Sequence, residues 1–389
     1  MSSDPQPETK TAGFGPELFI VAGLGVALVA GLALWGMNKA KEGAEPTPSR
    51  PSRSGELIVD RMVGDRVCAE CHPGESALFA RSGHSKTLHP ISKSGVAQGL
   101  DGRSFPDPEL PGVTWTYHYQ DGTFTIERVE GDSTESMTAD YAFGSDSHAT
   151  TFVSVVEGPR HAPAVFEHRL THFAKGDRMG ITPGQEEGSA MFGRMHAGRR
   201  SAEVETVHCF GCHSTLTSAE GRSRFDAKTM VMNVSCESCH GPGRDHVAAA
   251  RVAGPGAELA MDYGPNRYKA DDQMRLCGQC HRHPDMAPPG SIRPDNPEIV
   301  RFQPVGLMQS RCYKESRQAL NCATCHDPHA PVATNSTAYD RACLKCHKGA
   351  AANVCPAPGA SAGNCAGCHM PRQDSGQGVL FADHWIRIP

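Results

Sequence analysis

The sequence lacks a strong excess of charge of either sign. Its 38 Lys and Arg residues are balanced by 43 Asp and Glu residues, for a formal net charge of −5. This balance excludes a protein that binds nucleic acid through a basic surface, and it excludes an acidic disordered chain. No unit of roughly 20–50 residues recurs, which excludes a solenoid. Long helices and strands are also disfavoured by the 41 Gly and 29 Pro, so the chain needs another source of order.

Charge is absent altogether from residues 18–37, LFIVAGLGVALVAGLALWGM. An apolar helix of this length spans roughly 30 Å, the thickness of a bilayer core. We therefore predict a transmembrane anchor here, after a short polar tail at residues 1–17. The alternative is a cleaved signal peptide, but the apolar run is long for one and no clear cleavage site follows it. Four basic residues follow the span, Lys39, Lys41, Arg50 and Arg53, and by the positive-inside rule they favour a cytoplasmic position for the rest of the chain.

Apolar residues are scarce in residues 38–58, which are rich in Pro, Ser and charge. This composition predicts a flexible linker. We expect the folded domain to cover residues 59–389.

Cysteine is missing from a long stretch of that domain, between Cys71 and Cys209. Residues 113–129 within it alternate aromatic and β-branched residues around an Asp-Gly pair, which predicts a β-hairpin. Residues 149–157 are typical of another strand. We therefore expect a small strand-rich segment over residues 95–205.

Seven copies of C-x-x-C-H supply the missing source of order. Two intervening residues let both sulfurs reach the two vinyl groups of one porphyrin, and the adjacent His binds the iron. We predict seven covalently bound c-type haems, attached through Cys68, Cys71, Cys209, Cys212, Cys236, Cys239, Cys277, Cys280, Cys322, Cys325, Cys343, Cys346, Cys365 and Cys368. The proximal iron ligands are then His72, His213, His240, His281, His326, His347 and His369.

Zinc and disulfides are the alternatives to haem. A zinc ribbon needs two cysteine pairs for each metal and has no use for a His after every pair. A disulfide framework does not require a constant spacing or a trailing His. Haem therefore explains the pattern best.

Covalent haem attachment also decides the expected compartment, because it takes place on the extracytoplasmic side of bacterial membranes. We give it more weight than the four basic residues after the span. The expected protein is a single-pass protein of the cytoplasmic membrane with its haem domain on the periplasmic side. The expected fold is mainly α and irregular, organised around covalent haems, with the small β-rich haem-free segment and one N-terminal transmembrane helix.

Two cysteines, Cys312 and Cys355, fall outside the motifs. In an oxidising compartment such a pair most simply forms a disulfide. It would close a loop around the fifth and sixth haems. The alternative is two unrelated buried thiols.

The 20 histidines are numerous enough to give every haem a second His ligand. A bis-His iron suits electron transfer, whereas Met as the sixth ligand would raise the potential. With 14 Met in the chain, the sequence leaves Met open. The positions near motifs favour His84, His246, His329 and His384 as distal ligands, followed by His89, His148 and His283. A surface or propionate-contacting role is the alternative for each, and is the expected role of His118, His161, His168, His172, His196 and His208.

Several of these motifs resemble a known family. They are Cys68-Ala-Glu-Cys71-His72 with Ser82-Gly-His84, Cys236-Glu-Ser-Cys239-His240-Gly-Pro-Gly-Arg-Asp-His246, Cys322-Ala-Thr-Cys325-His326-Asp-Pro-His329 and Cys368-His369-Met370-Pro371-Arg372. Together they are similar to multihaem cytochromes of the cytochrome c-552/c-554 type, which are related to hydroxylamine oxidoreductase and pentahaem nitrite reductase. The resemblance covers most of residues 60–389. It implies closely packed haems and bis-His ligation of most irons. The C-x-x-C-K motif of the pentahaem nitrite reductases is absent.

Three functions are compatible with these observations. The first is an electron conduit with no catalytic residue, which takes electrons from a quinol-oxidising complex or another redox partner protein. The second is an oxidoreductase in which one five-coordinate haem acts on a small nitrogen or sulfur compound. The third is a cytochrome subunit docked on a larger membrane redox complex.

Overall fold

The computed structural model describes residues 56–158, 161–186, 197–253, 261, 269–316, 319–347, 363–375 and 378–388. These residues belong to one compact unit, Glu56–Pro389. Residues 1–17 and 18–37, most of the predicted linker, and Cys355 lie outside the described residues. Among the helices of the described ranges, none is long and apolar enough to cross a membrane.

The β-hairpin predicted around the Asp-Gly pair is confirmed. Strands β3 (Val113–Gln120) and β4 (Thr123–Glu130) pair in antiparallel register, and Gln120 lies opposite Thr123. The two turn residues, Asp121 and Gly122, have φ values of 52° and 82°. A two-residue turn with both φ values positive matches the twist of the flanking strands, which explains the preference for Asp-Gly.

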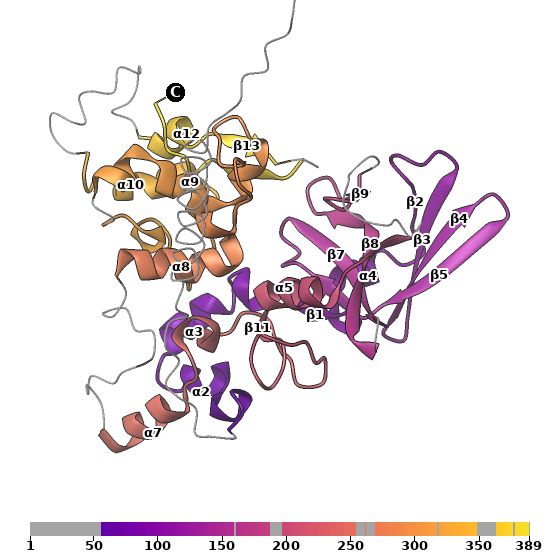
Figure 1. The fold of residues 1–389 in the computed structure, drawn as a ribbon, viewed down its shortest axis with the longest axis horizontal. Coiled ribbons are helices and arrows are strands. Elements are labelled where there is room, and N and C mark those ends of the chain that lie inside the picture. The colour runs from indigo at the N-terminus through magenta and orange to yellow at the C-terminus, as the bar shows by residue number, and fades with distance from the viewer. Residues whose placement is uncertain are drawn as a thin grey trace, which may run out of the picture. The chain divides into compact units, whose positions relative to one another are not determined.

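Two antiparallel sheets make up the strand-rich segment (Figure 1). In the first sheet, β3 and β4 lie between β2 (Ser104–Pro106) and β5 (Ser133–Ala139). The second sheet has the order β1-β6-β7-β8-β10, and β9 also pairs with β8. Its strands are β1 (Leu88–Pro90), β6 (Tyr141–Phe143), β7 (Ala149–Glu157), β8 (Pro163–Phe173), β9 (Arg178–Ile181) and β10 (Gly198–Arg200). The strand predicted at residues 149–157 is therefore confirmed as β7.

Apolar residues alternate along the strands and form one core between the two sheets. Trp115, Tyr117 and Phe124 of the first sheet pack in this core with Phe152 and Leu170 of the second, and helix α4 (Gly95–Gly99) also contributes. The opposite face of the second sheet packs on helix α5 (Glu203–His213), where Phe210 contacts Phe143 with ring centres 4.9 Å apart. The sheets thus form the platform that holds α5, and α5 carries the second C-x-x-C-H motif.

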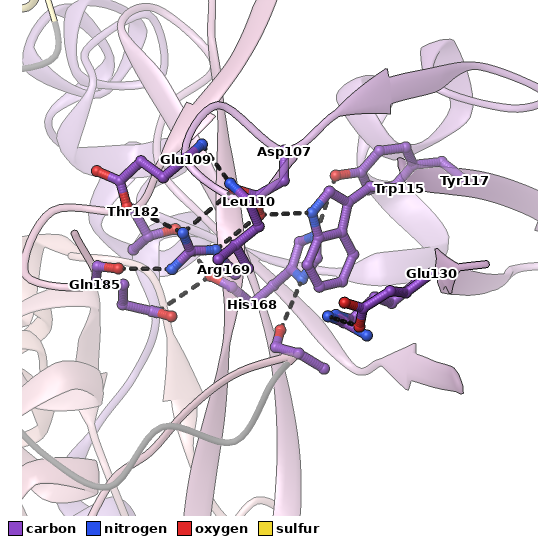
Figure 2. Close-up of polar contacts among 12 residues, drawn as sticks. Asp107, Glu109, Leu110, Trp115, Tyr117, Glu130, His168, Arg169, Thr182 and Gln185 are labelled. Atoms are coloured by element: carbon purple, nitrogen blue, oxygen red, sulfur yellow. Dashed lines mark hydrogen bonds and ion pairs between the residues drawn. The ribbon is translucent and has the colours of Figure 1, made fainter. Parts of the chain in front are cut away.

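A buried polar cluster lies inside this segment (Figure 2). Arg169 donates to Asp107 at 2.7 Å, to Glu109 at 3.0 Å and to the carbonyl of Gln185 at 2.8 Å. Next to it, His168 is fully buried, and its Nε2 lies 3.0 Å from the hydroxyl of Tyr117. His168 and Arg169 therefore join β8 of the second sheet to β3 of the first sheet and to the loop that follows β2.

The remainder of the unit consists of short helices and turns, as the Gly and Pro content predicts. The α-helices are α2 (Asp65–Ala69), α3 (Pro73–Phe79), α6 (Cys236–His240), α7 (Arg244–Ala253), α8 (Ala270–His281), α9 (Gln303–Gln309), α10 (Arg311–Glu315), α11 (Asp340–Cys343) and α12 (Cys365–His369). Single 3₁₀ turns connect them at η1 (Val59–Arg61), η2 (His84–Lys86), η3 (Ile91–Lys93), η5 (Pro284–Met286), η6 (Pro297–Arg301), η7 (Cys322–Thr324) and η8 (Ser336–Tyr339). Two small hairpins complete the unit, β11 (Ser214–Leu216) with β12 (Val231–Met232) and β13 (Arg372–Asp374) with β14 (Leu380–Ala382). Apolar clusters in this part are small, such as Met274 with Leu307 and Tyr313.

Candidate haem-binding site

A single continuous cavity of about 3890 Å³ runs through the helical part of the unit. Ligand pockets usually have volumes of roughly 300–1,000 Å³, so this cavity has room for several large cofactors. Its lining includes all fourteen cysteines of the C-x-x-C-H motifs and the seven histidines that follow them. His84, His246, His329 and His384 also line it. The helical part is therefore built around the space that covalent haem would fill.

Local helical geometry turns the two cysteines and the histidine of each motif toward one side. Three and four residues after a given position, a helix returns to the same face. Helices α6 and α12 begin at the first cysteine of a motif, and α5 and α8 end at its histidine. Where the helix is shorter, the turn is kept, because the amide of His326 donates to the carbonyl of Cys322 at 2.9 Å. The sequence spacing thus produces the arrangement that one porphyrin requires.

Buried and half-buried acidic side chains fasten one motif to another. Asp65 of α2 accepts a hydrogen bond from the amide of Cys236 at 3.0 Å. Glu237 of α6 accepts from the amides of Val63 and Gly64, both at 2.9 Å. Asp340 of α11 accepts from the amide of Cys365 at 2.8 Å. Each bond joins a carboxylate to a helix N-terminus, where the unpaired amides favour negative charge.

Contacts between cysteines show which motifs are neighbours. Four pairs of thiols from different motifs lie within hydrogen-bonding reach of each other. Cys68 of the first motif reaches Cys236 of the third, and Cys212 of the second reaches Cys280 of the fourth. Cys277 of the fourth motif reaches Cys322 of the fifth, and Cys343 of the sixth reaches Cys365 of the seventh. Cys239 is within electrostatic reach of Cys277, and Cys325 of Cys343. The four thiol pairs join the motifs into three groups, the first with the third, the second and fifth with the fourth, and the sixth with the seventh. The two longer-range electrostatic interactions relate these groups to one another.

Four proximal histidines have a second imidazole at the spacing that an iron would need. Two imidazoles on opposite faces of one iron have ring centres roughly 6.3 Å apart, because each iron–nitrogen bond is roughly 2 Å long and each nitrogen lies roughly 1.1 Å from its ring centre. The observed pairs are His72 with His246 at 6.4 Å, His281 with His84 at 6.1 Å, His240 with His329 at 6.1 Å, and His326 with His384 at 6.1 Å. The residues therefore fit four bis-His haems.

Segments distant in sequence deliver these second imidazoles. His384 reaches α9 because position 306 is a glycine, where a Cβ atom would lie 2.9 Å from the carbonyl carbon of His384. Ser310 then donates to the carbonyl of His384 at 3.0 Å. Burial lowers the pKa of His84 and His281, and lowers that of His384 to about 4. The neutral imidazole is the form that binds a metal, so burial prepares these side chains for ligation.

The other histidines considered as distal ligands occupy different positions. His148 is exposed and lines the cavity, whereas His89, in β1, and His283, after α8, are not among the lining residues. Of the histidines expected to have other roles, His168 lies in the sheet core and His118 lies 3.3 Å from Glu127. His172 lies 2.8 Å from Asp177, His161 contacts Glu157 and His208 lies on α5. His196 lies outside the described residues.

Partners of the second ring nitrogen are functional residues that the sequence analysis missed. Nδ1 of His213 lies 2.8 Å from the carbonyl of Thr87, and Nδ1 of His369 lies 2.7 Å from the carbonyl of Arg387. Nδ1 of His281 lies 3.3 Å from the side-chain oxygen of Gln303. Such contacts fix the tautomer and the orientation of a metal-binding imidazole. No sequence signal marks them, because two of the acceptors are backbone atoms and all three are distant in the chain.

Two other expectations from the sequence concern metals and disulfides. Within the described ranges, no three His, Cys, Asp or Glu side chains converge as a zinc site would require. Cys312 of α10 lines the cavity, and burial raises the pKa of its thiol. Its proposed partner lies outside the described residues, so the disulfide stays a prediction.

Comparison with known proteins agrees with this geometry. Residues 182–241, which include the second and third motifs, match the family model described as cytochrome c554 and c-prime. Over 399 aligned residues the chain is 22% identical to the dissimilatory sulfite reductase MccA of Wolinella succinogenes, and the match covers 85% of this chain. The chain spans about half of that relative's length, 53%.

Two solved structures are also similar. The outer cell wall cytochrome OcwA matches with a TM-score of 0.45 and 15% identity, over 84% of this chain and 80% of that one. The octahaem sulfite reductase MccA of Wolinella succinogenes matches with a TM-score of 0.35 and 16% identity, over 89% of this chain and 59% of that one. Motifs, cavity and sequence relatives define the class of protein: this chain is a multihaem c-type cytochrome. Within that class, residues 182–241 are similar to the family described as cytochrome c554 and c-prime.

Proposed function

We propose that the chain binds seven covalent haems and conducts electrons between redox partners. The observation that carries the proposal is the single cavity lined by all fourteen motif cysteines, their seven histidines and five further histidines, four of which pair with a motif histidine. The haem irons would carry one electron each. The chain's own residues attach the rings, supply axial imidazoles and exclude water from the space between neighbouring rings. Bis-His ligation leaves no open position for a substrate, which favours conduction over catalysis at those four haems.

The arrangement of motifs supports a continuous path. The thiol contacts place each motif next to at least one other, so neighbouring rings would lie side by side. Together with the longer-range electrostatic interactions of Cys239 with Cys277 and of Cys325 with Cys343, they give the order first, third, fourth, fifth, sixth and seventh motif, with the second branching from the fourth. Electrons would therefore enter at one end and leave at the other without crossing a gap in the chain of cofactors.

The location and partners remain part of the proposal. Residues 18–37 would anchor the chain in the cytoplasmic membrane, with the haem domain on the extracytoplasmic side, where haem is attached. A quinol-oxidising complex or another redox protein would supply the electrons.

A second candidate function is favoured by one observation at the second motif. Among the described residues, no second imidazole lies at ligand spacing from His213, His347 or His369, and the ring centre of His213, the one of the three on the sheet-packed helix α5, instead lies 4.8 Å from that of Phe143. This haem would then be five-coordinate and open to a small molecule. The sequence relative named as a sulfite reductase makes a small sulfur or nitrogen compound the class to test.

Two measurements on the purified holoprotein test these proposals. We expect intact mass spectrometry of the wild type to find seven haems. A Cys365→Ser/Cys368→Ser variant should carry one haem fewer, and the matched Cys312→Ser control should still carry seven. A colourless protein or a smaller count in the wild type would contradict the conduit. Electron paramagnetic resonance (EPR) then separates the candidates: low-spin signals alone favour conduction, whereas a high-spin signal with sulfite- or hydroxylamine-dependent turnover favours the enzyme.

A further inference from the structure

The imidazoles of His84 and His281 meet at an angle that sets them apart from the other pairs. Their ring planes cross at 79°, close to perpendicular. The three other pairs are closer to parallel, with angles of 24°, 4° and 28°. The relative orientation of two axial imidazoles determines how the iron d orbitals split. Perpendicular rings give a highly anisotropic low-spin EPR signal, and near-parallel rings give a rhombic one.

This pair belongs to the motif with the most neighbours. Cys277 of the fourth motif is within hydrogen-bonding reach of Cys322 in the fifth, and Cys280 of Cys212 in the second. Cys239 of the third motif is within electrostatic reach of Cys277. A cofactor at this position would be the junction of the proposed path, so its potential would affect electron flow in every direction.

One side chain is placed to control the plane of His281. The side-chain oxygen of Gln303 lies 3.3 Å from Nδ1 of His281, and Gln303 also lines the cavity. Gln303 is the first residue of α9, and Pro304 follows it in the first turn, where proline is preorganised for the helix. Helix α9 packs on α8, which carries His281. The acceptor is therefore held by a rigid element and not by a loop.

The position of the proton on the imidazole decides which side chain donates in this hydrogen bond. A neutral imidazole that binds iron through Nε2 carries its proton on Nδ1, so His281 donates and Gln303 accepts. A bond at Nδ1 restricts rotation of the ring about its bond to the metal and increases the basicity of the ligand. A more basic ligand stabilises the ferric state over the ferrous state.

We propose that Gln303 is a positioning residue for His281, which holds the ring nearly perpendicular to His84 and thereby gives the fourth haem its own potential and EPR signal. The inference rests on the proposed bis-His haem at this motif. It assigns to Gln303 an electronic role at the junction of the path, separate from haem attachment.

The test uses EPR-monitored redox titration of the intact holoprotein. In the wild type we expect one highly anisotropic low-spin signal beside rhombic ones. Gln303→Leu removes the acceptor, so this signal moves toward the rhombic type while the haem count is unchanged. Gln303→Glu keeps an acceptor and makes it stronger. It should preserve the anisotropic signal and shift the ferric–ferrous equilibrium of that haem about tenfold toward ferric, or about 59 mV.

Gln309→Leu is the matched control, because Gln309 lies on the same helix and its side chain contacts Lys314, not an imidazole. This variant should keep the wild-type signal and potential. The inference is overturned if Gln303→Leu leaves the anisotropic signal in place, if Gln309→Leu abolishes it equally, or if Gln303→Glu causes no shift. A wild type with no low-spin signal would instead contradict the proposed function, so the two failures can be told apart.

Discussion

At the scale of single residues, each paired imidazole comes from the neighbourhood of a different motif. His246 follows the third motif and lies opposite His72 of the first, and His329 follows the fifth and lies opposite His240 of the third. Removing one such residue therefore affects a haem that another part of the chain attaches. The sequence could suggest these histidines by their closeness to a motif. It could not pair them, since pairing depends on contacts between distant segments.

His329→Ala tests this crossed arrangement. The change removes the imidazole opposite His240 and leaves every attachment cysteine in place, so we expect the haem count to stay the same and one low-spin haem to become high-spin. Reduced protein should then bind carbon monoxide at one site more than the wild type does. His118→Ala is the control, because that exposed His contacts Glu127 in the sheet and lies far from the motifs in sequence. A spectrum unchanged by His329→Ala would rule out this residue as a ligand.

At the scale of secondary structure, the strands and turns that short-range sequence patterns determine could be predicted. The hairpin β3–β4 follows from alternation and the Asp-Gly turn, and β7 follows from its β-branched run. The short strands of the two-sheet segment, such as β1 and β10, were not predicted, because they gain their stability from partners distant in sequence. The same limit applies to His168, for which the sequence predicts a surface or propionate-contacting role, a prediction that is wrong because the side chain is fully buried in the core between the sheets.

His168 gives the sheet segment a predicted pH dependence. Burial lowers the pKa of His168 to about 3, below the ordinary value of 6.5. The unfolded segment therefore binds a proton at a higher pH than the folded one, so the stabilisation is complete above pH 6.5 and is lost as pH falls toward 3. We expect up to about 1.4 kcal/mol of lost stability for each pH unit in this window.

Hydrogen exchange of the β8 amides at several pH values measures this effect. His168→Gln keeps a polar partner for Tyr117 and cannot be protonated, so the variant should lose most of the slope between pH 6.5 and 4. An identical slope in both proteins would assign the pH dependence to other groups.

At the scale of the whole molecule, the order of motifs in space differs from their order in sequence. The first motif contacts the third, and the second contacts the fourth, while His384 near the C-terminus returns to the fifth. Spacing within each motif is local and could be read from the sequence. The order of the motifs along the path could not be read from the sequence, because it arises from hydrogen bonds between different segments, such as those of Asp65 with Cys236 and of Asp340 with Cys365.

This order predicts that loss of different haems has different effects on conduction. Cys277→Ala/Cys280→Ala removes the attachment at the junction and separates the first and third motifs from the fifth, sixth and seventh. Cys365→Ala/Cys368→Ala removes only the last position. Stopped-flow reduction should therefore show a large slow phase in the first variant and a small loss of amplitude in the second, when both retain six haems by mass. Equal kinetics in the two variants would mean that electrons do not pass through the fourth position, and the path would have to follow another order.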